Sequence, residues 1–297
     1  MVNDINNIKI WIETFGSNRE NCIILISGAM APATFWDDQF CEALSANHFV
    51  IRFDNRDYGY STHFKEQDPP PYRIDDMVED VKAILDYHEV ESAHIVGHSL
   101  GGSIAQLFAV RYPQRVKSLI PISSPIIAKG DLEYKETPRE VMDGLWEILL
   151  SNKMYQDYER GKDEFVRIYR VLNGGYELDV DMAYSYIRRM YETEYIKPHL
   201  NHTNIQKGIP DIYEALSSLP CQILFIYGES DYLPANAYNT QLLAEALANA
   251  SCLLLKKAGH MFFNRTIWKT LETSIGKFTT STHLSKKVLR IKSNSCP

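Results

Sequence analysis

Short apolar segments rich in β-branched residues alternate along this chain with longer segments whose apolar positions recur at the helical period. Near-continuous apolar runs of this kind are typical of parallel strands that helices cover on both faces. The pattern predicts strands at 8–14, 22–27, 49–53, 93–96, 118–122, 222–227 and 252–256. We therefore expect a sheet whose strands are mostly parallel.

The segments between these strands have the period of amphipathic helices. From 75 to 88 the apolar residues share one helical face, and Asp75 is the candidate N-cap. The same reasoning predicts helices at 38–45, 100–112 and 236–248. Regular alternation of strands and helices is typical of a doubly wound sheet, so the predicted fold class is α/β.

The alternation stops between about Pro125 and Pro220. Helical segments at 138–150, 162–172, 180–194 and 210–216 follow one another there without a strand. Ten of the eighteen tyrosines of the chain lie between Tyr134 and Tyr213, where they pack a helical layer, line an apolar pocket, or do both. We expect a core domain formed by 1–124 and 221–280, with a helical cap at 125–220. The segment 281–297 is expected to be a solvated basic tail, since it contains four basic residues and no acidic one: Lys286, Lys287, Arg290 and Lys292.

Composition and charge exclude several classes of protein. The chain has 297 residues and a net charge of −7, so it lacks the basic surplus of a nucleic-acid-binding protein. No apolar run approaches the roughly 20 residues that a membrane-spanning helix needs, and the N-terminus has no secretory signal pattern. The five cysteines form no C-x-x-C pair, which predicts reduced, structural thiols in a cytoplasmic protein. The sequence leaves the oligomeric state open.

A candidate nucleophile lies in the G-x-S-x-G segment Gly97-His98-Ser99-Leu100-Gly101. This segment directly follows a predicted strand and directly opens a predicted helix. A serine on such a tight turn tolerates only small residues two positions away on either side, and both of those positions are glycine. Ser99 as a mere N-cap of the helix is the alternative. We interpret Ser99 as a nucleophile at the start of a helix.

A serine hydroxyl needs a base and a carboxylate that orients the base. Among the nine histidines, His260 stands out because it follows the last predicted strand of the core and precedes a helix. The carboxylate is expected after the preceding strand, where both Glu229 and Asp231 occur. Asp231 is preferred because it lies further into the turn, and Pro234 fixes the exit of that turn.

The developing oxyanion of an acyl-transfer reaction needs two converging N–H donors. Leu100, which directly follows the nucleophile, supplies the first amide. The second donor is expected in the turn Ser27-Gly28-Ala29-Met30, and Ala29 is preferred over Met30 because Gly28 permits a sharp turn just before it. Ser27 and Met30 are expected to line the pocket.

These residues closely resemble the α/β-hydrolase superfamily over nearly the whole chain. Asp54–Ser61 looks like the D-x-R-G-x-G-x-S loop of that family, and 111–116 looks like its R-Y-P-x-R-V turn. The order Ser99, Asp231, His260 is the order of the family's triad. The N-R-D form of the loop and the Ser-Gly-Ala-Met turn resemble those of capped esterases such as the anthracycline methylesterases. The chain departs from many members by having Ser27 in place of His and Asp57 in place of Gly.

The resemblance implies an α/β-hydrolase fold with a helical cap inserted after the sixth strand of that fold. It also implies a cofactor-independent serine hydrolase, most simply a carboxylesterase that cleaves small to medium apolar esters. A C–C bond hydrolase, a thioesterase, an acyltransferase and a cofactor-free perhydrolase use the same triad and remain alternatives. A ligand receptor that retained the fold is the alternative outside enzymes.

Other candidate sites are weaker. His199 and His202 are three residues apart but lack the acids or cysteines of a metal site, and no phosphate-binding or dinucleotide-binding motif occurs. We therefore expect neither a metal nor a cofactor. The expected partner is a small-molecule ester, without nucleic acid and without stable membrane insertion.

Overall fold

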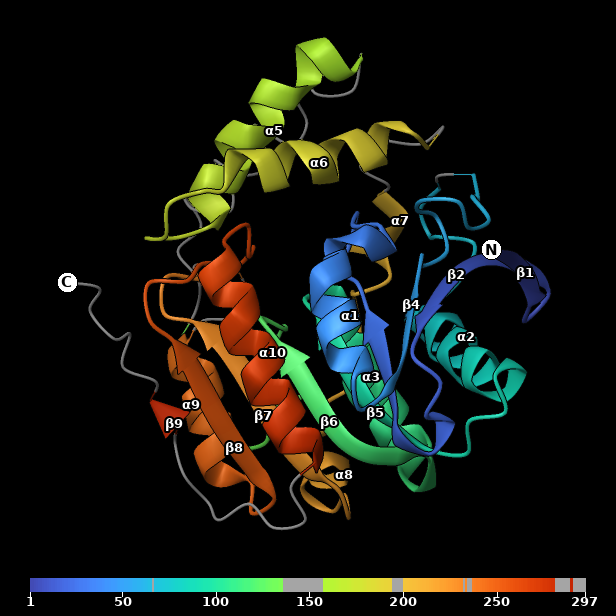
Figure 1. Ribbon diagram of the computed structural model, residues 1–297. Helices are drawn as coiled ribbons and strands as arrows, with labels where there is room; N and C mark the ends of the chain where they lie inside the picture. The colour runs from blue at the N-terminus through green and yellow to red at the C-terminus, as the bar shows by residue number, and fades with distance from the viewer. Residues whose placement is uncertain are drawn as a thin grey trace.

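The computed structural model describes residues 1–65, 67–135, 157–193, 200–231, 233, 237–280 and 289–290. A nine-stranded sheet forms the centre of this part of the chain (Figure 1). Its strands are β1 (Val2–Ile5), β2 (Ile8–Phe15), β3 (Cys22–Ile26), β4 (Phe49–Phe53), β5 (Ala93–His98), β6 (Val116–Ile122), β7 (Gln222–Gly228), β8 (Ala250–Leu255) and β9 (Leu289–Arg290). The spatial order is β1-β2-β4-β3-β5-β6-β7-β8-β9.

The sheet is parallel except at one edge. β1 and β2 form an antiparallel hairpin, and β2 is antiparallel to β4. Every other neighbouring pair from β4 to β9 is parallel. This confirms the mostly parallel doubly wound α/β sheet that the sequence predicts. β1 and β9 were not expected, and β9 places two residues of the predicted basic tail in the sheet beside β8.

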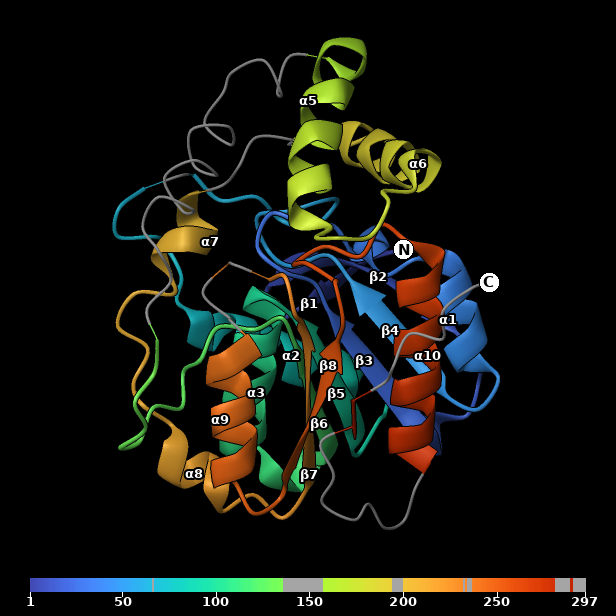
Figure 2. The same cartoon turned by 90° about the vertical axis from the view of Figure 1, so that its left-hand side faces the viewer.

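Helices cover both faces of the sheet, as Figures 1 and 2 show. One face carries α1 (Asp38–Ser45) and α10 (Arg265–Thr280). The other carries α2 (Ile74–Tyr87), α3 (Leu100–Arg111) and α9 (Ala237–Ala246). Because helices cover both faces, β3 and β4 are buried along their whole length, including Arg52 of β4.

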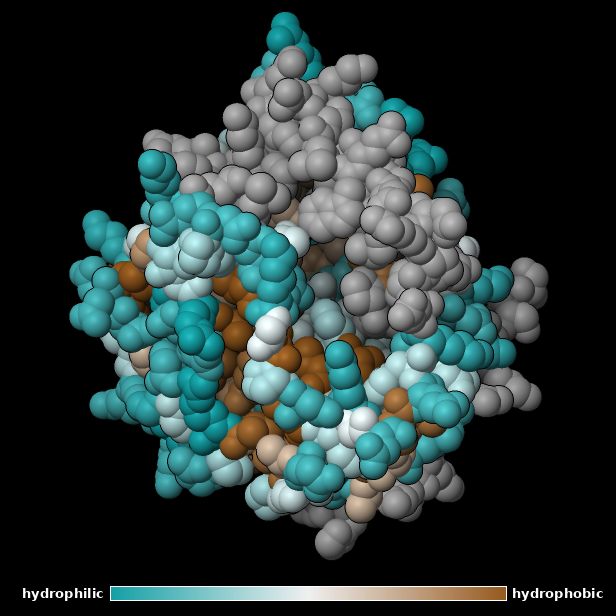
Figure 3. Space-filling model, turned by 180° about the vertical axis from the view of Figure 1, so that it is seen from behind, coloured by the Kyte–Doolittle hydropathy of each residue, from teal (hydrophilic) through white to brown (hydrophobic). Residues whose placement is uncertain are grey.

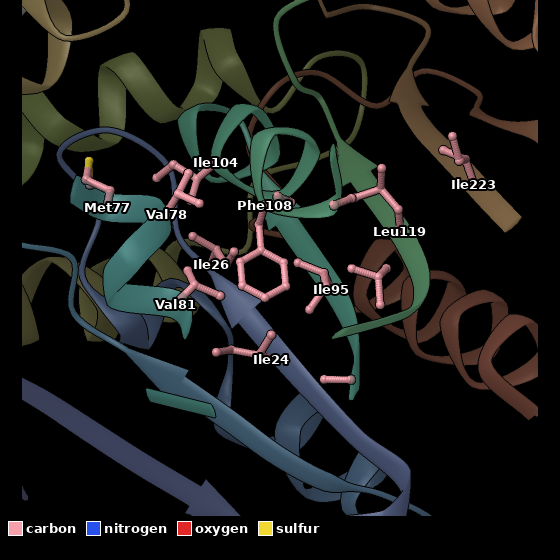
Figure 4. Packing of buried hydrophobic residues seen from close by; sticks show 14 of the residues in the cluster. Ile24, Ile26, Met77, Val78, Val81, Ile95, Ile104, Phe108, Leu119 and Ile223 are labelled. Carbon is pink, nitrogen blue, oxygen red and sulfur yellow. The ribbon is translucent and has the colours of Figure 1, made fainter. Parts of the chain in front are cut away.

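The alternation of side chains along β3 divides the core into two clusters. Ile24 and Ile26 point to the cluster under α2 and α3, whereas Ile23 and Leu25 belong to the cluster under α1 and α10. Figure 4 shows Phe108 of α3 directed into the first cluster, among side chains from β3, β5 and α2. Both clusters support the carboxyl end of β5, where Ser99 follows.

A helical insertion follows β6, as predicted. Its described helices are α5 (Tyr158–Leu172), α6 (Val180–Tyr191), α7 (Leu200–Asn204) and α8 (Tyr213–Ser217). α5 and α6 lie beyond the carboxyl ends of the strands (Figures 1 and 2). Their apolar faces extend the second core cluster with Phe165, Tyr186 and Ile187. The helix predicted at 138–150 lies outside the described residues.

Several helix starts differ from the prediction, among them those of α2, α5 and α8, which begins at Tyr213 rather than at 210. α2 begins at Ile74, so Asp75 is not its N-cap but lies in its first turn. The Asp76 carboxylate accepts a hydrogen bond from the Arg73 amide at 2.7 Å, which satisfies an amide at the start of the helix. α5 begins at Tyr158, four residues before the predicted start, because the Asp157 side chain caps it through the Arg160 amide.

Hydrophilic side chains cover much of the described surface. Seen from behind, hydrophobic residues gather mainly in a hollow near the middle of the face (Figure 3). Four of the cysteines, Cys22, Cys41, Cys221 and Cys252, are buried free thiols, as expected of structural cysteines.

Candidate active site

Ser99 occupies a sharp turn between β5 and α3. Its backbone has φ 53° and ψ −121°, a left-handed conformation that a non-glycine residue rarely adopts. The turn is held because the Ser99 amide donates to the Ile122 carbonyl at 2.9 Å, and the Ser99 carbonyl accepts from the Gly102 amide. The side chain is half-buried. This is the geometry of a nucleophile elbow, with the hydroxyl at the N-terminus of α3.

The two glycines around Ser99 are required by close backbone approaches. A Cβ at Gly97 would lie 2.1 Å from the Gly101 carbonyl oxygen, and a Cβ at Gly101 would lie 2.2 Å from the Ile26 carbonyl oxygen. Both distances are far shorter than any real contact of a Cβ atom. The spacing of the G-x-S-x-G segment therefore follows from the packing of β5 against the start of α3 and of that start against the end of β3.

Asp231 and His260 are brought together from the ends of two neighbouring strands. Asp231 follows β7 and His260 follows β8, and the Nδ1 atom of His260 lies 3.0 Å from Oδ2 of Asp231. The aspartate side chain is fully buried and that of His260 is 10% exposed. Oδ1 of Asp231 accepts from the Leu233 amide, which fixes the carboxylate in its turn. Nδ1 therefore carries the imidazole proton, and Nε2 is left as the basic atom.

Glu229, the rival acid, points elsewhere. Its carboxylate accepts a hydrogen bond from the Lys257 amide at 3.1 Å, and the residue is exposed. It holds the start of the loop that carries His260 rather than the imidazole itself.

The loop that carries His260 is bonded to the insertion. The Gly259 amide donates to the Asn173 carbonyl at 3.2 Å, and the Met261 amide donates to the Leu172 carbonyl at 2.9 Å. Both acceptors lie at the C-terminal end of α5, whose last carbonyls need partners outside the helix. The insertion thus fixes the backbone on both sides of His260, a connection that the sequence did not reveal.

The side chain of His98 contacts the backbone of His260. Its Nε2 atom lies 2.8 Å from the carbonyl oxygen of His260, and its ring stacks on Phe35 at a centroid distance of 4.4 Å. Complete burial lowers the pKa of His98 well below its ordinary value, so the ring is neutral. Nε2 must then carry the proton and donate it to the carbonyl. In the described part of the chain, Nδ1 of His98 has no hydrogen-bond partner.

The turn after β3 lies directly against the elbow. A Cβ at Gly28 would be 3.0 Å from the Cβ of Ser99, so this turn passes within van der Waals contact of the serine. Among the described residues, no acceptor bonds to the amides of Ala29 and Leu100. The Met30 amide, by contrast, donates to Nδ1 of His202 at 3.2 Å. Of the three candidate donors, Ala29 and Leu100 are therefore the two whose amides have no acceptor among the described residues.

The side chain of Ser27 and side chains of the loop after β4 hold the ends of this turn. Ser27 is fully buried and its hydroxyl donates to the Pro32 carbonyl at 3.2 Å, so the prediction that Ser27 lines the pocket is wrong. Asn55 donates to the Ser27 carbonyl, and Asp54 accepts from the Ala33 amide at 2.7 Å. Burial raises the pKa of Asp54 to about 6, while its backbone donors oppose that shift.

Ion pairs connect α6 of the insertion to the core. Arg189 donates to both carboxylate oxygens of Asp38, at 3.0 and 2.6 Å. Asp38 also accepts from the buried Arg52, which in turn bonds to Glu13. A polar cavity of about 220 Å³ lies beside these pairs, bounded also by Pro32 and Glu192, and neither Ser99 nor His260 lines it. Four of the charged residues that line this cavity, Glu13, Asp38, Arg52 and Arg189, already pair with one another.

The described residues contain neither a candidate metal site nor a candidate membrane span. There, no group of three or more His, Cys, Asp or Glu side chains is arranged to hold a metal ion. His202 uses both ring nitrogens in bonds to the protein, and His199 lies outside the described residues. No helix in the same part of the chain is long and apolar enough to cross a membrane.

Several known proteins resemble this chain in sequence. The model of a family described as alpha/beta hydrolase fold matches residues 21–264. The rhodomycin D methylesterase DauP of Streptomyces sp. (strain C5) is 39% identical over 115 residues, which are 38% of this chain and 38% of the methylesterase. The bifunctional esterase/perhydrolase DCH of Acinetobacter calcoaceticus is 24% identical over 253 residues, 84% of this chain and 88% of that protein.

Solved structures share the fold. The esterase EaEST from Exiguobacterium antarcticum superimposes with a TM-score of 0.73 over 92% of this chain and 96% of its own, at 16% sequence identity. This likeness extends through the sheet and into the insertion, whereas the match to the methylesterases spans about two fifths of their length. The fold is therefore shared along nearly the whole chain, and higher sequence identity is confined to part of it.

Proposed function

The chain belongs to the alpha/beta hydrolase family, and within it we propose that this protein is a cofactor-independent carboxylesterase with Ser99 as its nucleophile. His260 is the general base and Asp231 orients it. The amides of Ala29 and Leu100 form the oxyanion hole. The observation that carries this proposal is the buried Asp231–His260 pair, presented at the same end of the sheet as the strained Ser99 turn.

Each step of ester hydrolysis has a group suited to it. Nε2 of His260 takes the proton of the Ser99 hydroxyl as its oxygen attacks the ester carbonyl. The imidazolium that forms is stabilised through Nδ1 by Asp231, at 3.0 Å. The tetrahedral oxyanion accepts the Ala29 and Leu100 N–H groups, and the N-terminus of α3 adds positive potential.

Collapse of this intermediate breaks the bond to the alcohol, which leaves with the proton from His260. A water molecule then gives its proton to the same Nε2 atom and attacks the acyl-enzyme. The acid is released, and the proton returns to Ser99. No redox step or metal-bound water is required in this sequence.

The insertion bears on the choice of substrate. Phe263 lies three residues after the proposed base. Tyr169 of α5 and Tyr186 of α6 pack on its ring, at centroid distances of 4.6 and 5.2 Å. An apolar roof of this kind favours acyl or alcohol groups that are themselves apolar. The names of the relatives, a methylesterase and an esterase/perhydrolase, support an ester as the substrate class. We therefore assign the substrate to small or medium apolar esters.

A chain-length series of p-nitrophenyl esters tests this function. Each methylene that enters an apolar pocket adds up to about 0.8 kcal/mol of binding, or roughly a fourfold rise in kcat/KM, until the pocket is full. We expect an optimum followed by a fall, and loss of turnover in Ser99→Ala. A flat profile would contradict the assigned substrate class, and full activity in folded Ser99→Ala would contradict the proposed chemistry.

Deletion of the whole insertion would not be a clean test of specificity. The loop around His260 depends on the carbonyls of Leu172 and Asn173, so a variant without α5 loses support for the base. Such a variant is expected to lose kcat on every ester, whatever its chain length. The ester series is therefore best run on the complete chain.

A further inference from the structure

His202 lies buried beneath the turn that carries the proposed Ala29 donor. It belongs to α7, in the C-terminal part of the insertion, and its side chain is fully excluded from solvent. Nδ1 of His202 lies 3.2 Å from the Met30 amide nitrogen, and Nε2 lies 2.7 Å from the Arg56 carbonyl oxygen. One imidazole thus connects the turn after β3 to the loop after β4.

The two contacts determine the protonation state of this ring. The Met30 N–H can only donate, so Nδ1 must present a lone pair and carry no proton. The Arg56 carbonyl can only accept, so Nε2 must carry the proton. The ring is therefore neutral, with its single proton on Nε2, and both of its nitrogens are satisfied.

The Met30 backbone needs this support. Its φ is 56°, a conformation that is unfavourable for a residue with a side chain and persists only where the surroundings enforce it. The contacts of Ser27 and Asp54 hold only the ends of the turn. The bond to His202 is a side-chain contact to Met30 itself, the residue directly after Ala29.

The neighbours of His202 fix α7 against the same loop of the core. Asn201 donates to Oδ2 of Asp57 at 3.0 Å, and it is fully buried. Gln206 donates to the His202 carbonyl at 3.0 Å. These bonds fix α7 and with it the position of the His202 ring. A side chain that is fixed in this way can in turn fix the backbone of the turn that it contacts.

We propose that His202 is a positioning residue for the oxyanion hole, acting through the Met30 amide to aim the adjacent Ala29 N–H at the developing oxyanion. The inference rests on the proposed serine-esterase function. It assigns part of the catalytic geometry to the insertion, so that a residue of the insertion helps to build the site. His202 itself touches neither substrate nor the reacting atoms.

Two amide substitutions separate the two bonds of His202. In His202→Asn the side-chain oxygen occupies the place of Nδ1 and can accept from Met30, but nothing replaces Nε2. In His202→Gln the side-chain amide can occupy the place of Nε2 and donate to Arg56, but the acceptor for Met30 is lost. His202→Ala removes both bonds. Each variant is compared with wild type after thermal unfolding shows that it is folded.

The readouts are kcat and KM on one p-nitrophenyl ester, and the inhibition constant of an apolar trifluoromethyl ketone, which forms an oxyanion on the serine. Complete loss of an oxyanion donor costs about 100- to 1000-fold in kcat, so a misaimed donor should cost about 10- to 100-fold. We expect that loss in His202→Gln and His202→Ala, with KM nearly unchanged and ketone affinity weakened in parallel. His202→Asn should remain within about threefold of wild type, since it keeps the bond that matters.

Equal losses in the Asn and Gln variants, or wild-type kcat in the folded Ala variant, would overturn this inference. If the substitutions prevent folding, nitrogen NMR of the wild-type imidazole provides the test, and a proton on Nδ1 of His202 would overturn it. Failure of the proposed function is a different result: turnover would then survive in Ser99→Ala, whatever the His202 variants do.

Discussion

The imidazole of His98 donates a hydrogen bond from Nε2 to the carbonyl oxygen of His260 at 2.8 Å. The residue directly before the proposed nucleophile therefore holds the backbone of the proposed base. The two rings lie 4.9 Å apart between centroids, and burial keeps His98 neutral. Ser99 and His260 are thus positioned relative to each other by a bond that does not involve either of their side chains.

Substitution of His98 should separate this bond from simple packing. His98→Gln can place an amide N–H where Nε2 lies, whereas His98→Asn is too short to reach the carbonyl. We expect kcat within about threefold of wild type for Gln and a loss of about 10- to 100-fold for Asn, because a small misplacement of a base is costly. Steady-state kinetics on a p-nitrophenyl ester gives the answer. Equal activity of the two folded variants would show that the bond is unimportant.

Substitution of the two candidate acids, Asp231 and Glu229, should affect kcat very differently. Asp231→Asn should lower kcat by about four orders of magnitude, since an amide favours the wrong imidazole tautomer. Glu229→Gln should lower it by less than tenfold, because Glu229 bonds only to the Lys257 amide. Each variant replaces a carboxylate with an amide of the same shape, so the two can be compared directly. The measurement is kcat/KM of each on the same ester. A crippled Glu229→Gln beside an active Asp231→Asn would mean that the acid is misassigned.

The bond between the insertion and the core should depend on pH. Hydrogen bonds from Arg189 and Arg52 lower the pKa of Asp38 from 3.8 to about 2, so its stabilisation is complete above pH 3.8 and is lost as pH falls through 2. Asp38 is 40% exposed, and we therefore expect Asp38→Asn to cost only about 1 kcal/mol of unfolding free energy at pH 7.

Denaturant unfolding of wild type and Asp38→Asn between pH 7 and pH 2.5 checks this expectation. The difference between them should shrink below pH 4. Glu159→Gln, which removes an exposed charge from α5, serves as the control and should change stability little. A difference that is constant over the whole range would mean that the Asp38 carboxylate is not what holds α6.

Activity should be independent of added metal. Each step of the proposed reaction uses side chains and backbone amides of the chain, so dialysis against a strong chelator should leave kcat unchanged. The measurement is ester hydrolysis before and after dialysis, with and without added Zn²⁺. Loss of turnover that Zn²⁺ restores would require a different mechanism.

Much of the fold could be predicted from hydrophobic periodicity. The central strands are buried on both faces, and their continuous apolar runs distinguish them clearly from the amphipathic helices. β1 was missed because its four residues are mostly exposed and carry no apolar run. β9 was missed because its two residues are too few to give a periodic signal. α7 was missed because its five residues are also too few. The start of α2 was misplaced because the Asp76 carboxylate, rather than Asp75, satisfies the first amide.

The candidate site was predictable where chemistry depends on local sequence. The small residues around Ser99 and the strand-end positions of Asp231 and His260 are visible in the chain itself. The remaining contacts join residues far apart in sequence, such as His202 with Met30 and Asn173 with Gly259. Nothing in the spacing of His199 and His202 indicated that His202 contacts the turn after β3. Only the packing of the insertion on the core shows this contact.

The central claim is that Ser99 is a nucleophile activated by His260 and Asp231. The most direct test is to treat the protein with an alkyl fluorophosphonate, measure the intact mass, and locate the adduct by peptide mapping. We predict one adduct per chain on Ser99, slowed by orders of magnitude in His260→Ala and Asp231→Asn, and absent in Ser99→Ala. A folded wild-type protein that stays unlabelled, or that carries its adduct on a residue other than Ser99, would contradict the claim.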